Sequence, residues 1–154
     1  MQIWRTAIAL GFSLSLLLTA CIPPPPPPTT EVKITCPADF DQVDVTEMAR
    51  GTSQLVPDGH VIWVVLFPQI TGRYYPQNDP AVIEATGNWS SSVCIGVEGD
   101  VGLKFDILAV VADEAAQSSF RAYLADAKDR KDWPGLERLP EGATVYHRIT
   151  VTRK

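Results

Sequence analysis

The sequence has few of the residues that carry most enzyme chemistry. It contains only two histidines, His60 and His147, which lie in separate predicted strands. No His-x-x-x-His or Cys-x-x-Cys pair is present, so a zinc site has no starting point. The Gly-x-Ser-x-Gly elbow and the phosphate-binding glycine loop are also missing. The sequence therefore names no catalytic residue and no cofactor, and we expect a protein that is not an enzyme.

Clusters of basic residues are also missing. The chain has 13 Lys and Arg against 18 Asp and Glu, a formal net charge of -5. Nucleic acids and anionic lipid surfaces select for clustered Lys and Arg, so neither is an expected partner. The acidic groups at Asp39–Asp44 and Glu98–Asp100 lack the ligand spacing of a calcium loop. We expect solvated turns there and no metal.

The longest apolar run, Thr6–Leu18, is too short to cross a bilayer, which takes about 20 apolar residues. It has the length of a signal-peptide core, roughly 7–15 residues, and follows a segment with one charge, Arg5. A short buried helix of the mature fold is the alternative. The sequence predicts a signal peptide over residues 1–20.

The four residues Leu18-Thr19-Ala20-Cys21 resemble the lipobox of bacterial lipoprotein precursors. That resemblance implies cleavage before Cys21, a diacylglyceryl group on its thiol, and acylation, typically by palmitate, of its new amino group. Two or more acyl chains are needed for stable anchoring. Ile22 stands where many inner-membrane lipoproteins have Asp, which favours the outer membrane where the cell has one.

Cysteine is scarce, with three residues in the chain. With Cys21 lipidated, as the resemblance implies, Cys36 and Cys94 remain as a pair in an oxidising compartment, and we expect a disulfide between them. Strand alternation opposes this pairing, because Cys36 shares a face with Val32 and Ile34 whereas Cys94 points away from Val93 and Ile95. The bridge therefore requires a bulge or a position at a strand end.

Six consecutive prolines, Pro23–Pro28, follow the predicted lipid anchor. At about 3.1 Å per residue they form a stiff polyproline II spacer of about 19 Å. We interpret residues 21–30 as a tether and residues 31–154 as one folded domain. A ligand for proline-binding domains is the alternative role of this segment.

Hydrophobic periodicity predicts a mainly β domain. The expected strands lie near residues 32–36, 43–45, 60–67, 89–95, 103–111 and 144–152. One helix is expected at about 114–131, since Asp113 suits an N-cap and Ala116, Phe120 and Leu124 recur at helical spacing. Short strands separated by frequent turns favour a β-sandwich, with the helix between its last two strands.

The pattern also resembles the immunoglobulin-like accessory domains of bacterial surface proteins. The resemblance rests on Trp63 in a central apolar strand, the Arg73–Gln77 loop, Gly87–Trp89 and the alternating Leu103–Val111 segment. It implies an immunoglobulin-like β-sandwich. The chain departs from the pattern at Ser92, where a tyrosine two residues before the cysteine is expected, and by its helix.

One loop combines aromatic rings with side chains that form several hydrogen bonds: Arg73, Tyr74, Tyr75, Gln77 and Asn78. Such sets occur at protein interfaces and sugar-binding faces. The alternative is a strand end with one ring inward and Arg73 packed over it. Because neighbours in a strand point to opposite faces, we expect one tyrosine to be buried and the other exposed. Trp63 and Trp89 are expected in the core.

These observations predict an extracytoplasmic lipoprotein, anchored through Cys21 to the cell membrane or the outer membrane of the cell envelope. Its β-sandwich would act as a non-catalytic binding or adhesion module for an envelope protein or a glycan. A structural or assembly lipoprotein that docks on another envelope protein is the second hypothesis. A small secreted hydrolase is the third, and no set of nucleophile and base can be named for it.

Overall fold

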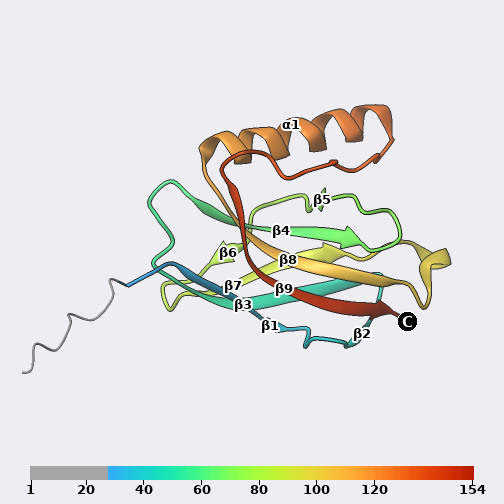
Figure 1. Cartoon of the computed structure of the whole chain (residues 1–154), viewed down its shortest axis with the longest axis horizontal. Helices are drawn as coiled ribbons and strands as arrows, with labels where there is room; N and C mark the ends of the chain where they lie inside the picture. Colours follow the sequence, from blue (N-terminus) through green and yellow to red (C-terminus); the bar gives the residue numbers. More distant parts are fainter. Residues whose placement is uncertain (1–27) are drawn as a thin grey trace, which may run out of the picture.

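The computed structural model describes residues 28–154 of the 154-residue chain. In this part of the chain nine strands form two sheets, and one α-helix covers one sheet (Figure 1). The predicted signal peptide, the lipobox with Cys21 and most of the proline segment lie outside the described residues. No helix within residues 28–154 is long and apolar enough to cross a membrane.

The first sheet has four strands in the order β1-β3-β7-β6, all antiparallel. Its strands are β1 (Glu31–Cys36), β3 (Thr46–Gln54), β7 (Asn88–Cys94) and β6 (Val82–Ile83). Alternate residues of the three longer strands are buried, which places one face of the sheet inward and leaves the other in solvent.

The second sheet has five strands in the order β2-β9-β8-β4-β5, and only β2 runs parallel to its neighbour. Its strands are β2 (Gln42–Val43), β9 (Ala143–Arg153), β8 (Lys104–Ala112), β4 (Val61–Pro68) and β5 (Tyr75–Pro76). The middle strands β4 and β8 are buried on both faces, which accounts for their nearly continuous apolar sequence.

Two apolar clusters hold the three layers together. Between the sheets lie Val32, Ala49, Trp89, Val93, Ile62, Val64, Ile107 and Ile149, together with their neighbours. On the other face of the five-stranded sheet, Trp63, Val65, Leu108 and Val110 pack against the helix residues Ala116, Phe120 and Leu124. Alternate residues of β4 therefore serve different clusters.

The helix α1 (Glu114–Arg130) confirms the predicted helix to within one residue. Its N-cap is Asp113, whose carboxylate accepts a hydrogen bond of 2.8 Å from the Ala116 N–H. At the other end Lys131 adopts a left-handed conformation and its N–H bonds the carbonyl of Ala127. The predicted apolar stripe faces the sheet.

The strand order confirms the predicted immunoglobulin-like β-sandwich. One sheet carries the first, second, fifth and fourth strands of that fold (β1, β3, β7, β6), and the other carries its third, sixth and seventh (β4, β8, β9). The helix lies between the last two strands, β8 and β9. Trp63 and Trp89 are both buried, as predicted. Trp63 faces the helix, however, and Trp89 is the tryptophan between the sheets.

The predicted disulfide is wrong, because Cys36 and Cys94 are both free thiols. Strand β3 lies between them, with Cys36 opposite Arg50 and Cys94 opposite Thr46. Two strand spacings of about 4.8 Å separate β1 from β7 by roughly 10 Å. A disulfide bridges Cα atoms no more than about 7 Å apart. The opposite alternation of the two cysteines was the sequence signal against the pairing.

Thiol titration checks this correction. Protein purified without reductant and then unfolded should show reactive thiols at both Cys36 and Cys94. In the folded protein Cys94, which is exposed, should react faster than the half-buried Cys36. A monomer in which neither residue reacts after unfolding would restore the disulfide.

Candidate functional site

The two tyrosines of the predicted binding loop pack against different apolar clusters. Tyr74 packs with the helix-side cluster and Tyr75 with the inter-sheet cluster. Both are half-buried, so the prediction of one buried and one exposed ring is wrong. Tyr75 lies in β5, a two-residue strand at the edge of the sheet, and Tyr74 lies directly before it. Because β5 has a neighbouring strand on one side only, neither ring is completely covered.

Gln77 is buried and serves the fold. Its Oε1 accepts the Cys94 N–H at 2.8 Å, and its Nε2 donates to the Tyr75 carbonyl at 3.2 Å. Its backbone carbonyl accepts the indole N–H of Trp63 at 2.7 Å. Asn78 is exposed and lines a groove beside the four-stranded sheet. The predicted binding loop is therefore divided between two surfaces.

Arg73 lies on the helix side of the loop. Its guanidinium pairs with the Glu137 carboxylate at 3.1 Å, and both side chains are accessible to solvent. The backbone of Tyr74 exchanges two hydrogen bonds with Leu136, at 2.9 and 2.8 Å. The approach of these segments requires Gly135, since a Cβ there would lie 2.7 Å from the Arg73 Cβ and 2.8 Å from the Tyr75 ring.

A set of side chains that the sequence did not bring together lies next to Tyr74. The Phe67 and Tyr74 rings are 4.8 Å apart between centroids. The guanidinium carbon of Arg148 lies 5.5 Å from the Phe67 centroid, in cation–π geometry. We call Phe67, Tyr74 and Arg148 the arginine–aromatic patch. It combines β4, the loop before β5, and β9 on the helix side of the five-stranded sheet.

A buried carboxylate positions this patch. Asp106 is 5% exposed on β8, and its Oδ1 accepts hydrogen bonds of 2.8 Å from the Gln69 amide and the Thr150 hydroxyl. Its Oδ2 lies 3.5 Å from Nη1 of Arg148. Because these partners satisfy the carboxylate, its burial is tolerated. Asp106 therefore holds the guanidinium over Phe67 while about half of the Arg148 side chain stays in solvent.

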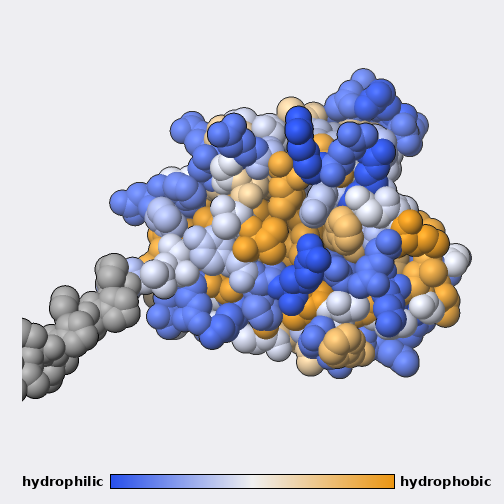
Figure 2. Space-filling model, viewed as in Figure 1, coloured by the Kyte–Doolittle hydropathy of each residue, from blue (hydrophilic) through white to orange (hydrophobic). Residues whose placement is uncertain are grey.

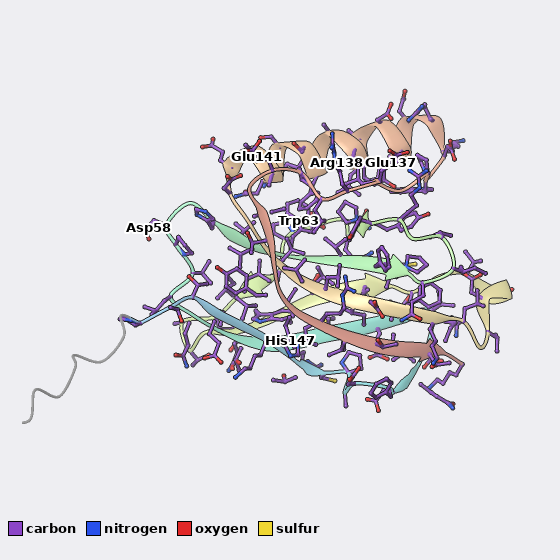
Figure 3. The ribbon with its side chains drawn as sticks, viewed as in Figure 1. Asp58, Trp63, Glu137, Arg138, Glu141 and His147 are labelled. Carbon is purple, nitrogen blue, oxygen red and sulfur yellow. The ribbon has the colours of Figure 1, made fainter. Side chains whose placement is uncertain are left out.

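A groove of about 730 Å³ lies between α1 and the segment that leads back to β9. Leu136, Leu139 and Pro140 form its apolar lining, with Ser119 on the helix side. Figure 3 shows the charged side chains Glu137, Arg138 and Glu141 along the segment beside α1, and Figure 2 shows apolar surface between hydrophilic residues on this face. The surface is amphipathic, with an apolar floor and a charged rim.

The two histidines have structural contacts. His147, on β9, accepts a hydrogen bond from the Ile34 N–H of β1 at 3.3 Å through Nδ1, which ties the first strand to the second sheet. The His60 Nδ1 lies 3.1 Å from the Asp58 carbonyl in the turn before β4. Neither imidazole contacts a nucleophilic side chain in these bonds.

The arginine–aromatic patch offers groups that can bind a ligand. Arg148 offers N–H donors to carboxylates or hydroxyls, and the Phe67 and Tyr74 rings offer flat apolar surface. Within residues 28–154 no group of three metal-ligating side chains occurs. Burial raises the pKa of Tyr123, but its hydroxyl accepts the Gly135 N–H at 3.1 Å and so holds the loop in place.

Neither a protein-family model nor a curated protein sequence matches the chain.

Proposed function

We propose that the protein is an extracytoplasmic, lipid-anchored binding module without catalytic activity, and that the arginine–aromatic patch recognises its partner. The observation that carries the proposal is the buried Asp106, which fixes a half-exposed Arg148 over Phe67. Burying the Asp106 carboxylate has a desolvation cost, which a guanidinium that is half in solvent offsets only in part. An Arg148 side chain that Asp106 already holds in place suits the recognition of a partner, because it loses less conformational entropy on binding.

The chemistry of the patch selects the kind of partner. A guanidinium beside two aromatic rings suits a ligand that presents a carboxylate or hydroxyl groups next to a flat or apolar surface. Another envelope protein and an acidic glycan both meet this description. An assembly role, in which the domain docks on one envelope protein, would use the same patch.

Replacement of Cys21 tests the anchor. In the Cys21→Ala variant the precursor should stay uncleaved and lack lipid, because the acceptor thiol is gone. Mass spectrometry of the membrane fraction should find diacylglycerol and acyl chains on the wild-type amino terminus only. Normal processing and acylation of the variant would remove the lipoprotein proposal.

Replacement of Arg148 tests the patch. Arg148→Ala should weaken partner binding at least tenfold and should cost roughly 1–3 kcal/mol of stability, because it leaves the buried Asp106 carboxylate with only its two neutral hydrogen-bond donors. Arg148→Lys should recover part of the binding, since it keeps the charge and loses the planar contact with Phe67. Glycan arrays and photo-crosslinking on intact cells measure the two partner classes.

The matched control is Arg130→Ala. Arg130 is also about half exposed and pairs with a carboxylate, Asp126, but it lies on α1 away from the aromatic rings. Binding that falls equally in both variants would reflect net charge and would contradict the patch.

A further inference from the structure

The four-stranded sheet has an incompletely paired edge. Strand β6 pairs with β7 only at Val82 with Ser90 and at Ile83 with Trp89. Beyond Ser90, β7 continues to Cys94 with no strand beside it on this side, although β3 stays paired along its other side. A backbone edge of this kind is a template for another strand.

The direction of the free backbone groups follows from the ladder. The Ile95 N–H bonds the Val45 carbonyl, so every second residue before it bonds toward β3. The peptide groups of Ser92 and Cys94 therefore point to the open edge. At Cys94 the side-chain amide of Gln77 accepts the N–H at 2.8 Å, as the carbonyl of a neighbouring strand would. Among the described residues, no partner takes the N–H or the C=O of Ser92 at this edge.

A groove of about 420 Å³ lies over this edge, within the range of ligand-binding sites. One wall consists of residues 77–80 and Val82, and the other of residues 90–92 and Cys94. From Ser90 to Cys94 the open edge extends about 13 Å at ~3.3 Å per residue, enough for an extended segment of about four residues.

The lining gives the groove a chemical preference. Met48 is 39% exposed on the outer face and Val82 is 69% exposed on the far wall, so both offer apolar contact. Asp79 supplies one exposed carboxylate. The serine and threonine hydroxyls between them can bond an approaching backbone.

We propose that this groove binds an extended segment of another envelope protein by strand addition to β7. The Ser92 N–H and C=O would pair with the backbone of the segment. One of its apolar side chains would contact Met48 and Val82, and a basic side chain would lie beside Asp79. The wall at residues 78–80, which includes Pro80, bars edge-to-edge contact between two whole sheets. A single slim strand therefore fits where a second copy of the domain does not. This site is independent of the arginine–aromatic patch.

The test uses the whole protein purified in detergent and a phage-displayed library of linear octapeptides as the probe. Selection should enrich peptides with apolar and basic residues two positions apart, since alternate side chains of a strand share a face. Ser92→Pro should weaken binding of the selected peptides at least tenfold, because it removes the N–H that points to the open edge. Proline is tolerated at such a position. Ser92→Ala keeps the N–H and removes only one hydroxyl, so it should weaken binding far less than Ser92→Pro does.

A second measurement protects the test against misfolding of the proline variant. In the wild-type protein, bound peptide should shift the Ser92 amide resonance and slow its hydrogen exchange, and Asp79→Lys should select against the basic peptides. Arg148→Ala should leave peptide binding unchanged, so this proposal and the proposed function can fail separately. The proposal would be overturned if no peptide is enriched, or if the enriched peptides leave the Ser92 amide unaffected. Self-association that Ser92→Pro abolishes would assign the edge to a second copy and also overturn it.

Discussion

Gly51→Ala should destabilise the domain by about 3 kcal/mol or more, at the upper end of the cost of overpacking a core. A Cβ on Gly51 would overlap the Lys33 carbonyl oxygen of β1 and the indole ring of Trp89. One of these contacts is backbone and the other is a buried ring that is 2% exposed, so neither can move cheaply. The melting temperature should fall by roughly 10 °C.

Gly99→Ala is the matched control, because a Cβ there meets nothing within 4 Å and the glycine has an ordinary backbone conformation. Its melting temperature should stay within about 2 °C of the wild type, as for most surface substitutions. Thermal unfolding followed by circular dichroism measures both variants. Equal stability of the two would mean that β1 and Trp89 are not packed as described.

Trp63→Ala should cost about 3–5 kcal/mol, the range for truncation of a large aromatic residue in a core. Trp63 is fully buried, lies 5.2 Å from the Phe120 ring, and donates its N–H to the Gln77 carbonyl. The substitution removes the aromatic contact between the sheet and Phe120 of α1 and leaves the Gln77 carbonyl without its indole donor. Figure 3 shows Trp63 between the helix and the strands.

Trp133→Ala is the control for Trp63→Ala. Trp133 is 45% exposed, and its ring makes an edge contact, 6.5 Å between centroids, with Tyr123. Its truncation should cost about 1 kcal/mol, near the average for point substitutions. Urea unfolding of the two variants gives the difference. If Trp63→Ala costs no more than Trp133→Ala, the helix layer contributes little to the stability of the domain.

The elements that could be predicted from the sequence are the long ones with a clear apolar pattern. Their apolar residues are numerous enough to indicate both the type and the position of the element, as in β4, β8, β9 and α1. Strand β3 was missed, because its buried positions, Ala49, Gly51 and Ser53, are small and give no apolar alternation. The structure shows why they are small: Trp89 packs over Gly51, and a larger residue would not fit.

The candidate sites were less accessible to sequence reasoning. Asp106, Arg148 and Phe67 belong to three strands, and only the order of the sheet brings them together. The one local signal in the sequence was the carboxylate of Asp106, which stands between the apolar residues Phe105 and Ile107. In the loop that the sequence did single out, Tyr74 belongs to the arginine–aromatic patch. Gln77 forms hydrogen bonds within the fold, and Asn78 lines the groove beside the four-stranded sheet.

The helix between β8 and β9 has a consequence for how the chain folds. These two strands pair along most of their length, yet residues 113–142 separate them, where a hairpin would use a few. Closing so long a connection costs roughly 2 kcal/mol more entropy than closing a four-residue turn. Docking of α1 on Trp63 offsets that cost by shortening the distance that the chain must search. The last strand is therefore expected to join the sheet after the helix has formed.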